Sequence, residues 1–286
     1  MIPDAYAFGF LFMLTEWAKR PVRGEWLRLM MAHSDTLRLP EPIAGGFQLC
    51  ETPATRVNPG FRAYIDKKYH KIVSVVDFLA ASGAQGAEAV VAACEIFAQG
   101  SARQWLKVAG AEKADLVDWR LQARPAPDRG VVAEFGSFVG YSCVRMAWRS
   151  WGETRVLSLE SDAVHVLVAR HVAIVAGRSP VVELVPGMAH DSVRRIIDEW
   201  GCESCVFAFM DHRGTRFHVE LQHLERLRAF APDAKFLADN TLKPGAPVNL
   251  WHFDHCGPRH LATSWSLPEF ASTDCEDWMT ASEIRP

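Results

Sequence analysis

The sequence predicts an α/β protein in which a mostly parallel sheet carries helices on both faces, preceded by a helical or irregular N-terminal extension. From residue 131 onward, short apolar segments alternate with segments of helical periodicity, and a glycine-containing turn joins the first strand to the first helix. Residues 1–65 show no such alternation. Alternating strands and helices form parallel sheets in α/β domains. We therefore expect two parts, an extension over residues 1–65 and an α/β domain over residues 66–286.

The extension has the weakest pattern in the chain. Helical spacing of its apolar residues predicts two short helices, Phe8–Lys19 and Glu25–His33. Leu37–Phe61 is rich in proline and glycine, which predicts an irregular segment that wraps the rest of the protein. The extension is large enough to be a docking surface for a protein partner.

Three helices are predicted between the extension and the sheet. Apolar residues at helical spacing or bounding glycines and prolines define them. The third ends before Pro125, because proline cannot continue a helix. The three predicted helices are Tyr64–Ala81, Ala87–Phe97 and Glu112–Ala123.

Five strands and four helices then alternate. The predicted strands are Val131–Ala133, Arg155–Leu159, Val181–Val185, Cys205–Met210 and Lys235–Ala238. The helices between them are Tyr141–Trp148, Ala163–Ala176, Asp191–Trp200 and Phe217–Phe230. Three further short segments are candidates for an antiparallel pair at one edge of the sheet: Trp251–His255, His260–Trp265 and Asp277–Ile284.

Composition limits the classes of partner. The net charge of −3 gives no electrostatic reason to expect nucleic acid. No apolar run reaches the ~18 residues of a membrane span. Residues 5–14 are a candidate for peripheral contact with a membrane surface. Asp4 stands where a signal peptide would carry positive charge.

The cysteines indicate a reducing compartment. There are seven, an odd number, and several lie in apolar surroundings. We expect a cytoplasmic or other reducing location, with an organellar or membrane-associated one as an open alternative. The pair Cys202 and Cys205 has C-x-x-C spacing without further zinc ligands, so we expect two reduced thiols. For His252, His255 and His260 we likewise expect packing or surface roles rather than a metal site.

Acidic side chains stand at the carboxyl ends of four predicted strands, where open α/β sheets bind their ligands. Glu134 follows the first strand, Glu160 ends the second, Asp211 follows the fourth, and Asp239 with Asn240 follows the fifth. An acid at the second strand suits the two hydroxyls of a ribose. Three hard oxygen ligands from the fourth and fifth strands suit Mg²⁺.

Six sequence motifs resemble the catechol O-methyltransferase family. In order they are VVAEFGSFVGYSCVRMA, LSLESD, VPGMAHD, FMDH, LADNTLKPGAP and SLPEF. The resemblance runs from Ala87 to the C-terminus, and the steps of 28 residues from Asp211 to Asp239 and 30 more to Glu269 fit the family's spacing. It implies a seven-stranded Rossmann-like methyltransferase sheet over residues 66–286 that uses S-adenosylmethionine.

The resemblance also implies roles for individual residues. Those that fall on cofactor-binding positions are Val108, Glu134, Gly136, Tyr141, Ser142, Glu160, Met188, Ala189, His190, Asp211 and His212. Those that fall on the magnesium ligands are Asp211, Asp239 and Asn240. Glu269 falls on the acid that hydrogen-bonds the second catechol hydroxyl. Trp105 and Pro244 fall on apolar walls of the substrate pocket.

One motif departs from the family. The family has tryptophan and then a general-base lysine after the Asp-His pair, whereas this chain has Arg213 and Gly214. Positive charge could come instead from Lys243, Arg213 or Arg216. A metal-chelated phenol could also ionise without a protein base, more slowly, because general-base help is typically worth ~10²–10⁴.

The sequence therefore predicts a magnesium- and S-adenosylmethionine-dependent O-methyltransferase acting on a catechol-like small molecule, with Glu269 and Lys243 as catalytic candidates. The alternative is a catalytically impaired homologue that serves as a structural or scaffolding subunit. Gly214 and the extension favour that alternative, and Gly214→Lys would separate the two if it raised activity.

Overall fold

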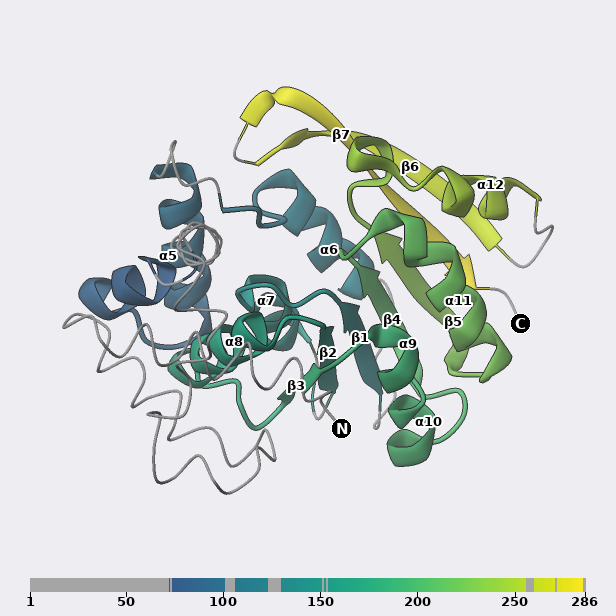
Figure 1. The fold of residues 1–286 in the computed structure, drawn as a ribbon, viewed down its shortest axis with the longest axis horizontal. Coiled ribbons are helices and arrows are strands. Elements are labelled where there is room, and N and C mark those ends of the chain that lie inside the picture. Colours follow the sequence, from purple (N-terminus) through teal and green to yellow (C-terminus); the bar gives the residue numbers. More distant parts are fainter. Residues whose placement is uncertain are drawn as a thin grey trace, which may run out of the picture.

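A seven-stranded sheet forms the centre of the protein in the computed structural model (Figure 1). The structure describes residue 72 and residues 74–100, 106–122, 130–150, 152, 154–255, 260–270 and 272–284. The strand order is β3-β2-β1-β4-β5-β7-β6. The strands are β1 (Val131–Phe135), β2 (Arg155–Glu160), β3 (Val182–Pro186), β4 (Cys205–Met210), β5 (Phe230–Ala238), β6 (His260–Glu269) and β7 (Ser272–Ile284).

The first five strands pair in parallel, and β7 pairs antiparallel with both β5 and β6. The strand order reverses between β1 and β4, because the chain moves outward through β2 and β3 and then returns to β4. Such a switch point brings the carboxyl ends of two neighbouring strands together and is where open sheets bind ligands.

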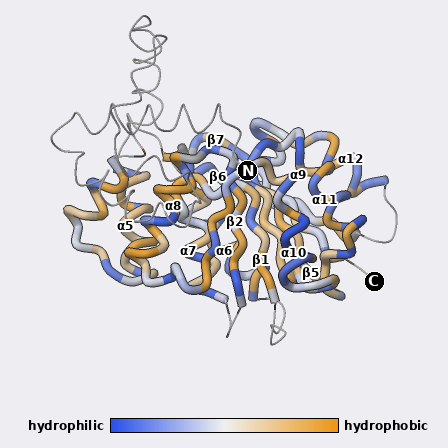
Figure 2. The backbone as a smooth tube through the Cα atoms, turned by 60° about the horizontal axis from the view of Figure 1, so that its bottom comes forward, coloured by the Kyte–Doolittle hydropathy of each residue, from blue (hydrophilic) through white to orange (hydrophobic). Residues whose placement is uncertain are grey.

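Helices cover both faces of the sheet, as Figure 2 shows. One layer contains α5 (Ala87–Gly100), α7 (Tyr141–Arg149) and α8 (Ala163–Val175), with α6 (Glu112–Gln122) beside them. The other contains α9 (Ala189–Ser192), α10 (Arg195–Trp200), α11 (Phe217–Arg226) and α12 (Pro247–His255). A helical segment at 74–82 precedes α5.

Successive residues of the strands enter opposite cores, because side chains alternate across a sheet. Val132, Val156 and Phe207 belong to the core under the α5–α8 layer. Val131 and Ala133 belong to the core under α10 and α11. Strands buried on both faces are typical of parallel sheets, and this explains why β4 is a continuous apolar run and why β1 is apolar except at Glu134.

The predicted α/β architecture is confirmed, with three corrections. The helix predicted over Asp191–Trp200 is two short helices, α9 and α10. The helix predicted over Phe217–Phe230 ends at Arg226, because Arg228 adopts a left-handed backbone conformation, and Phe230 already begins β5. Trp251–His255, a strand candidate, lies in α12, which begins at Pro247, a residue well suited to the first helical position.

Several predictions fall outside the described residues. These are the extension over residues 1–65 with its two helices, and Trp105. In the part of the chain that the structure describes, no helix is both long and apolar enough to cross a membrane.

Candidate functional site

Four predicted site residues meet at the carboxyl edge of the sheet. Asp211 directly follows β4, Asp239 and Asn240 directly follow β5, and Glu269 ends β6. Asn240 has a left-handed backbone conformation (φ 56°), which turns the chain sharply from β5 into the short turn η6 (Thr241–Gly245). The parallel pairing of β4 with β5 therefore places the two aspartates side by side, as the sequence predicted.

A buried lysine lies among these acids. Lys113, in the first turn of α6, is 1% exposed, and its Nζ lies 2.7 Å from Asp239 Oδ1 and 2.9 Å from Glu269 Oε1. The third partner is Asp277 of β7, whose Oδ2 is also 2.9 Å from Nζ. Sequence reasoning missed Lys113 and Asp277. The available signal was a lysine in the first turn of a helix, where the helix dipole favours acids.

Asp277 fixes the orientation of the Asn240 side chain. Asn240 Nδ2 donates to Asp277 Oδ2 at 2.6 Å and to Glu269 Oε1 at 3.1 Å. Since both amide hydrogens are directed at carboxylates, the amide oxygen Oδ1 remains as the atom for a cation. The other oxygen of Asp277 accepts from the backbone N–H of Lys243 at 2.8 Å, which joins η6 to β7.

The cluster carries more negative than positive charge. Burial raises the pKa of Asp211 well above its ordinary value, and repulsion from Asp239 adds to this. Burial also raises the pKa of Asp239, to about 6, although Lys113 opposes the shift. Burial alone would lower the pKa of Lys113, but its three carboxylate partners outweigh burial and raise it. One ammonium among four carboxylates leaves a deficit of positive charge that a divalent cation would fill, so the donor set fits Mg²⁺.

The position expected to hold a lysine has no space for a side chain. A Cβ at Gly214 would lie 2.4 Å from the carbonyl oxygen of Gly245 and 3.2 Å from the Cβ of Ala246. Gly214 thus allows the start of the 3₁₀ turn η5 (Gly214–Arg216) to pack against the end of η6. A lysine side chain could not begin at this position without displacement of one of the two turns.

Of the three alternative cations, Lys243 is the one whose backbone is hydrogen-bonded to the acidic cluster in the described contacts. Its backbone is bonded to Asp277, and its exposed Nζ lies 3.2 Å from Cys275 Sγ, a contact that raises the pKa of Lys243. Arg216 Nη2 is instead bonded to Glu220 at 3.3 Å. Arg213 is exposed.

A second group of polar residues surrounds the end of β1. Glu134 lies within β1, paired with Ser158 of β2, rather than after the strand as expected. Its Oε2 accepts a hydrogen bond from the Ser158 hydroxyl, whereas its buried Oε1 has no hydrogen-bond partner. Burial raises the pKa of Glu134 to about 7, against the hydrogen bonds from Ser142 and Ser158.

Glu160 closes the turn after β1 through its carboxylate. Oε2 accepts from the backbone N–H of Phe138 at 3.0 Å, and Oε1 accepts from that of Asp162 at 2.8 Å. Burial would raise the pKa of Glu160, but His165 and these backbone donors lower it, so the carboxylate is charged. A carboxylate has about four acceptor positions, so Glu160 can still accept from a ribose.

The ring of His212 is held without hydrogen bonds. Both of its ring nitrogens are buried and have no partner, and the ring packs on Phe135 and Phe217 with centroid separations of 5.7 and 5.2 Å. Burial and repulsion from Arg216 lower its pKa to about 4, so the imidazole is neutral. Unpaired buried polar groups are rare. The unpaired atoms of His212 and of Glu134 belong to side chains that both lie within electrostatic range of Glu160. A polar cofactor bound beside Glu160 could supply their missing hydrogen-bond partners.

The remaining predicted cofactor residues have varied surroundings. Gly136 has φ +102°, and a Cβ there would lie 2.6 Å from the carbonyl oxygen of Asp211, so the glycine allows the loops after β1 and β4 to approach. The buried Tyr141 donates its hydroxyl hydrogen to Glu95 and accepts from Arg145 at 3.3 Å. Val108 is buried before α6.

The loop after β3 carries the last three predicted cofactor residues. Met188 is 54% exposed and caps α9, whose first two residues are Ala189 and the exposed His190. Pro244 is also exposed, in η6 after a cis peptide bond.

The C-x-x-C pair and the histidines near the C-terminus have varied surroundings. Cys202 is exposed and Cys205 buried, and both are free thiols. His252 is buried and His255 stacks on Trp251. Among the described residues, three His, Cys, Asp or Glu side chains converge closely at one place, His190 with Glu220 and His223, which sequence reasoning did not find.

Several characterised proteins are similar to this chain. Catechol O-methyltransferase of Sus scrofa is 31% identical over 149 residues, which are 52% of this chain and 78% of that protein. Catechol O-methyltransferase B of Danio rerio is 30% identical over 145 residues, and the transmembrane O-methyltransferase of Homo sapiens is 30% identical over 153. The match spans 54% and 52% of those two proteins, about half of their length. No protein-family model matches the chain.

Solved structures agree with the observed fold. An O-methyltransferase of Bacillus cereus, in complex with SAH, has a TM-score of 0.56 at 17% identity over 78% of this chain and 96% of that chain. The O-methyltransferase TomG of Streptomyces achromogenes, in complex with SAM, has a TM-score of 0.56 at 20% identity over 69% of this chain and 90% of that chain. These two similarities establish the Rossmann-like methyltransferase fold.

Proposed function

Because the chain belongs to the catechol O-methyltransferase family, we propose that it transfers a methyl group from S-adenosylmethionine to one hydroxyl of a catechol-like small molecule, with Mg²⁺ as a second cofactor. The observation that carries the proposal is the convergence of Asp211, Asp239, Asn240 and Glu269 at one edge of the sheet. Their surplus of negative charge supports a cation there.

The two polar regions of the site would each hold one of the two cofactors. When bound, S-adenosylmethionine supplies the methyl group and Mg²⁺ supplies the charge that lowers the pKa of a catechol hydroxyl. In the proposal, Asp211, Asp239 and the amide oxygen of Asn240 hold the magnesium. Glu160 accepts hydrogen bonds from the ribose, and the neutral His212 lies beside the adenine.

Lys113 is a positioning residue in this proposal. Its ammonium holds Asp239, Glu269 and Asp277, so these carboxylates cannot turn away from the site. Preorganised charges of this kind lower the cost of orienting a substrate. Glu269 is 18% exposed through its side chain, so it can accept a hydrogen bond from the second catechol hydroxyl.

Gly214 cannot accept the proton of the attacking hydroxyl, so in this proposal the proton passes to solvent. We assign Lys243 as the source of positive charge that favours ionisation of the hydroxyl, because its backbone is anchored to Asp277 and its raised pKa keeps the exposed side chain an ammonium. Lys243→Ala should then slow turnover by about 10²-fold. Lys243→Arg keeps the charge and should retain most of the rate, so a loss as large as that of Lys243→Ala would show that the charge is not what Lys243 supplies.

A second candidate function is that of a non-catalytic homologue used as a structural subunit. Gly214 favours it, because the backbone of Gly245 occupies the space in which a lysine side chain would begin. This candidate predicts cofactor binding without turnover, or neither.

Calorimetric titration with S-adenosylmethionine, with and without Mg²⁺, followed by a methyl-transfer assay on catechol, tests the proposal. Glu160→Ala should abolish cofactor binding. Asp239→Asn should abolish magnesium-dependent turnover, and the matched control is Asp233→Asn, an exposed aspartate within β5, the strand that Asp239 follows. Turnover that survives a chelator would remove magnesium from the proposal. Cofactor binding without methyl transfer to any of a panel of catechols would favour the non-catalytic candidate.

A further inference from the structure

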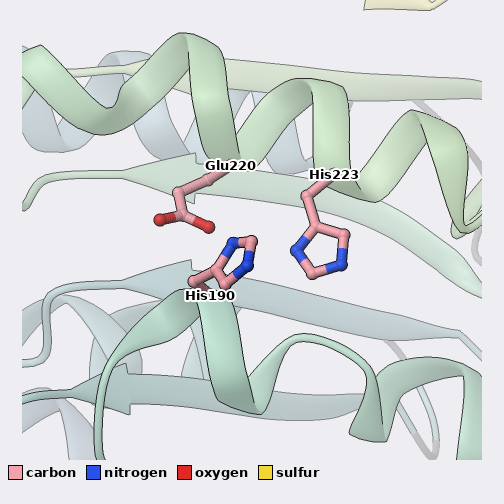
Figure 3. Close-up of side chains that lie close together, drawn as sticks. All are labelled: His190, Glu220 and His223. Carbon is pink, nitrogen blue, oxygen red and sulfur yellow. The ribbon is translucent and has the colours of Figure 1, made fainter.

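Two histidines and a glutamate, none of them a metal ligand proposed above, converge between α9 and α11 (Figure 3). His190 comes from α9, and Glu220 and His223 come from α11. Glu220 and His223 are three residues apart, so they lie on one face of α11. One potential ligand atom from each of the three residues lies within 4.8 Å of those of the other two.

Two atoms in this cluster are buried without a hydrogen-bond partner. Glu220 is 2% exposed, and its Oε2 has no partner, while its Oε1 accepts from Arg216. His223 Nδ1 is likewise buried and unpaired. Native proteins seldom leave a buried carboxylate oxygen unpaired. In Figure 3 the Glu220 carboxylate and the His223 ring both face the space beside His190.

We propose that His190, Glu220 and His223 bind a transition-metal ion of the zinc type. Two imidazoles and one carboxylate form a common three-ligand set for zinc and leave a fourth position open. His190 is exposed, so rotation of its side chain can bring its nitrogen to the ~2.0–2.2 Å distance at which zinc is bound. The rings of His190 and His223 are already close, with centroids 4.6 Å apart.

The surrounding charges determine which metals the cluster accepts. Arg216 neutralises Glu220 in part, and Arg194 and Arg226 lie within electrostatic range of His223. This positive environment disfavours Mg²⁺ and Ca²⁺, which are held mainly by carboxylate charge. Zinc, cobalt, nickel and copper form strong bonds to neutral imidazole. The two sites of the protein would therefore differ in metal preference.

Metal binding here would join two elements. It would fix α9 against α11, and His190 is itself one of the three residues, with Met188 and Ala189, that are assigned to the cofactor. This structural consequence for the cofactor rests on the proposed function, but the metal site itself does not.

The test is titration of the full chain, freed of metal, with Zn²⁺, and a parallel titration with Co²⁺ followed by visible absorption. We expect one ion per chain, with visible bands typical of nitrogen-ligated cobalt. Binding should weaken at least about tenfold in His190→Ala, His223→Ala and Glu220→Gln, since even partners outside the ligand shell cost 10–100-fold. Excess Mg²⁺ should not displace the ion.

Two controls keep the experiment decisive. His255→Ala removes an exposed histidine of α12 and should leave the affinity unchanged. Asp239→Asn removes a proposed magnesium ligand and should also leave it unchanged. If His223→Ala fails to fold, His190→Ala provides the same test, because His190 is exposed and its removal should not disturb the core. Absence of stoichiometric binding, or equal binding by His190→Ala and wild type, would overturn the proposal, and so would loss of binding in Asp239→Asn.

Discussion

Lys113 is the side chain on which the acidic cluster depends. It is buried, and its ammonium contacts Asp239, Glu269 and Asp277 at 2.7 to 2.9 Å. A buried ion pair adds little net stability when it is complete, but removal of one partner leaves the other charges without compensation. The stability of this edge of the sheet is therefore sensitive to residue 113.

Lys113→Met should lower the free energy of unfolding by roughly 3–5 kcal/mol at neutral pH. Urea unfolding followed by circular dichroism measures this change. The matched control is Lys107→Met, an exposed lysine just before α6, whose interactions are solvent-screened and should be worth no more than about 1 kcal/mol. Equal midpoints for the two variants would show that the ammonium does not compensate the carboxylates.

Glu134 should make stability depend on pH. Burial raises its pKa to about 7, above the ordinary value of 4.5, so between these values the folded state binds more protons than the unfolded state. Stability then falls as pH rises from about 5 to 7, with a slope of up to about 1.4 kcal/mol per pH unit. Below the unfolded pKa this contribution is fully present.

Glu134→Gln removes that slope while it keeps the shape of the side chain. Urea midpoints of wild type and Glu134→Gln, measured from pH 5 to 7, should diverge in favour of the variant as pH rises. His212 has a lowered pKa of about 4, so its contribution to stability rises with pH, opposite to that of Glu134. This contribution is present in both proteins and cancels in the comparison. Parallel curves for the two proteins would show that Glu134 titrates normally.

At the scale of elements, the contact between η5 and η6 controls the geometry of the site. Gly214 and Gly245 bring the two turns into backbone contact, and η6 directly follows the proposed ligand Asn240. A methyl group at position 214 must displace one turn.

Gly214→Ala should therefore destabilise the protein by about 1–3 kcal/mol, in the range of an overpacked core. Gly100→Ala is the control, because a Cβ at Gly100 would meet no atom within 4 Å. Thermal unfolding of the two variants checks the difference. The same clash applies to Gly214→Lys, the substitution that the sequence suggested as a test of the missing base. This variant would be inactive because of backbone strain, even if the lack of a general base were the protein's one catalytic defect. Gly214→Ala as stable as wild type would remove this objection.

The sequence predicted where the strands end, but it did not predict which side chains contact one another across the fold. Asp211, Asp239 and Asn240 could be placed because apolar runs mark where β4 and β5 end, and parallel strands end at one edge. Lys113 and Asp277 could not, because their contacts join positions 164 residues apart and no local pattern encodes them. Glu220 and His223 share a helix face that periodicity predicts, but their meeting with His190 depends on how α9 packs against α11.

At the scale of the whole molecule, cofactor binding should raise the free energy of unfolding and the Tm. A ligand that binds only the folded state adds about 2.7 kcal/mol at 100 times its Kd. For a domain of this size, that corresponds to a rise in Tm of roughly 5–10 °C. S-adenosylmethionine should produce this shift in wild type and none in Glu160→Ala, as measured by differential scanning calorimetry. A wild-type Tm that is unchanged at saturating cofactor would contradict the binding proposed here.

The place of β7 in the sheet sets the order in which the site can form. β7 follows every other strand in sequence, yet it lies between β5 and β6. Until β7 has been synthesised and has paired with β5, Lys113 and Asn240 lack Asp277, and the edge of β5 is open. Non-local pairings of this kind form slowly. The parallel strands can therefore assemble on the emerging chain before the acidic cluster exists, and a ligand of that cluster would recognise only molecules that have finished folding.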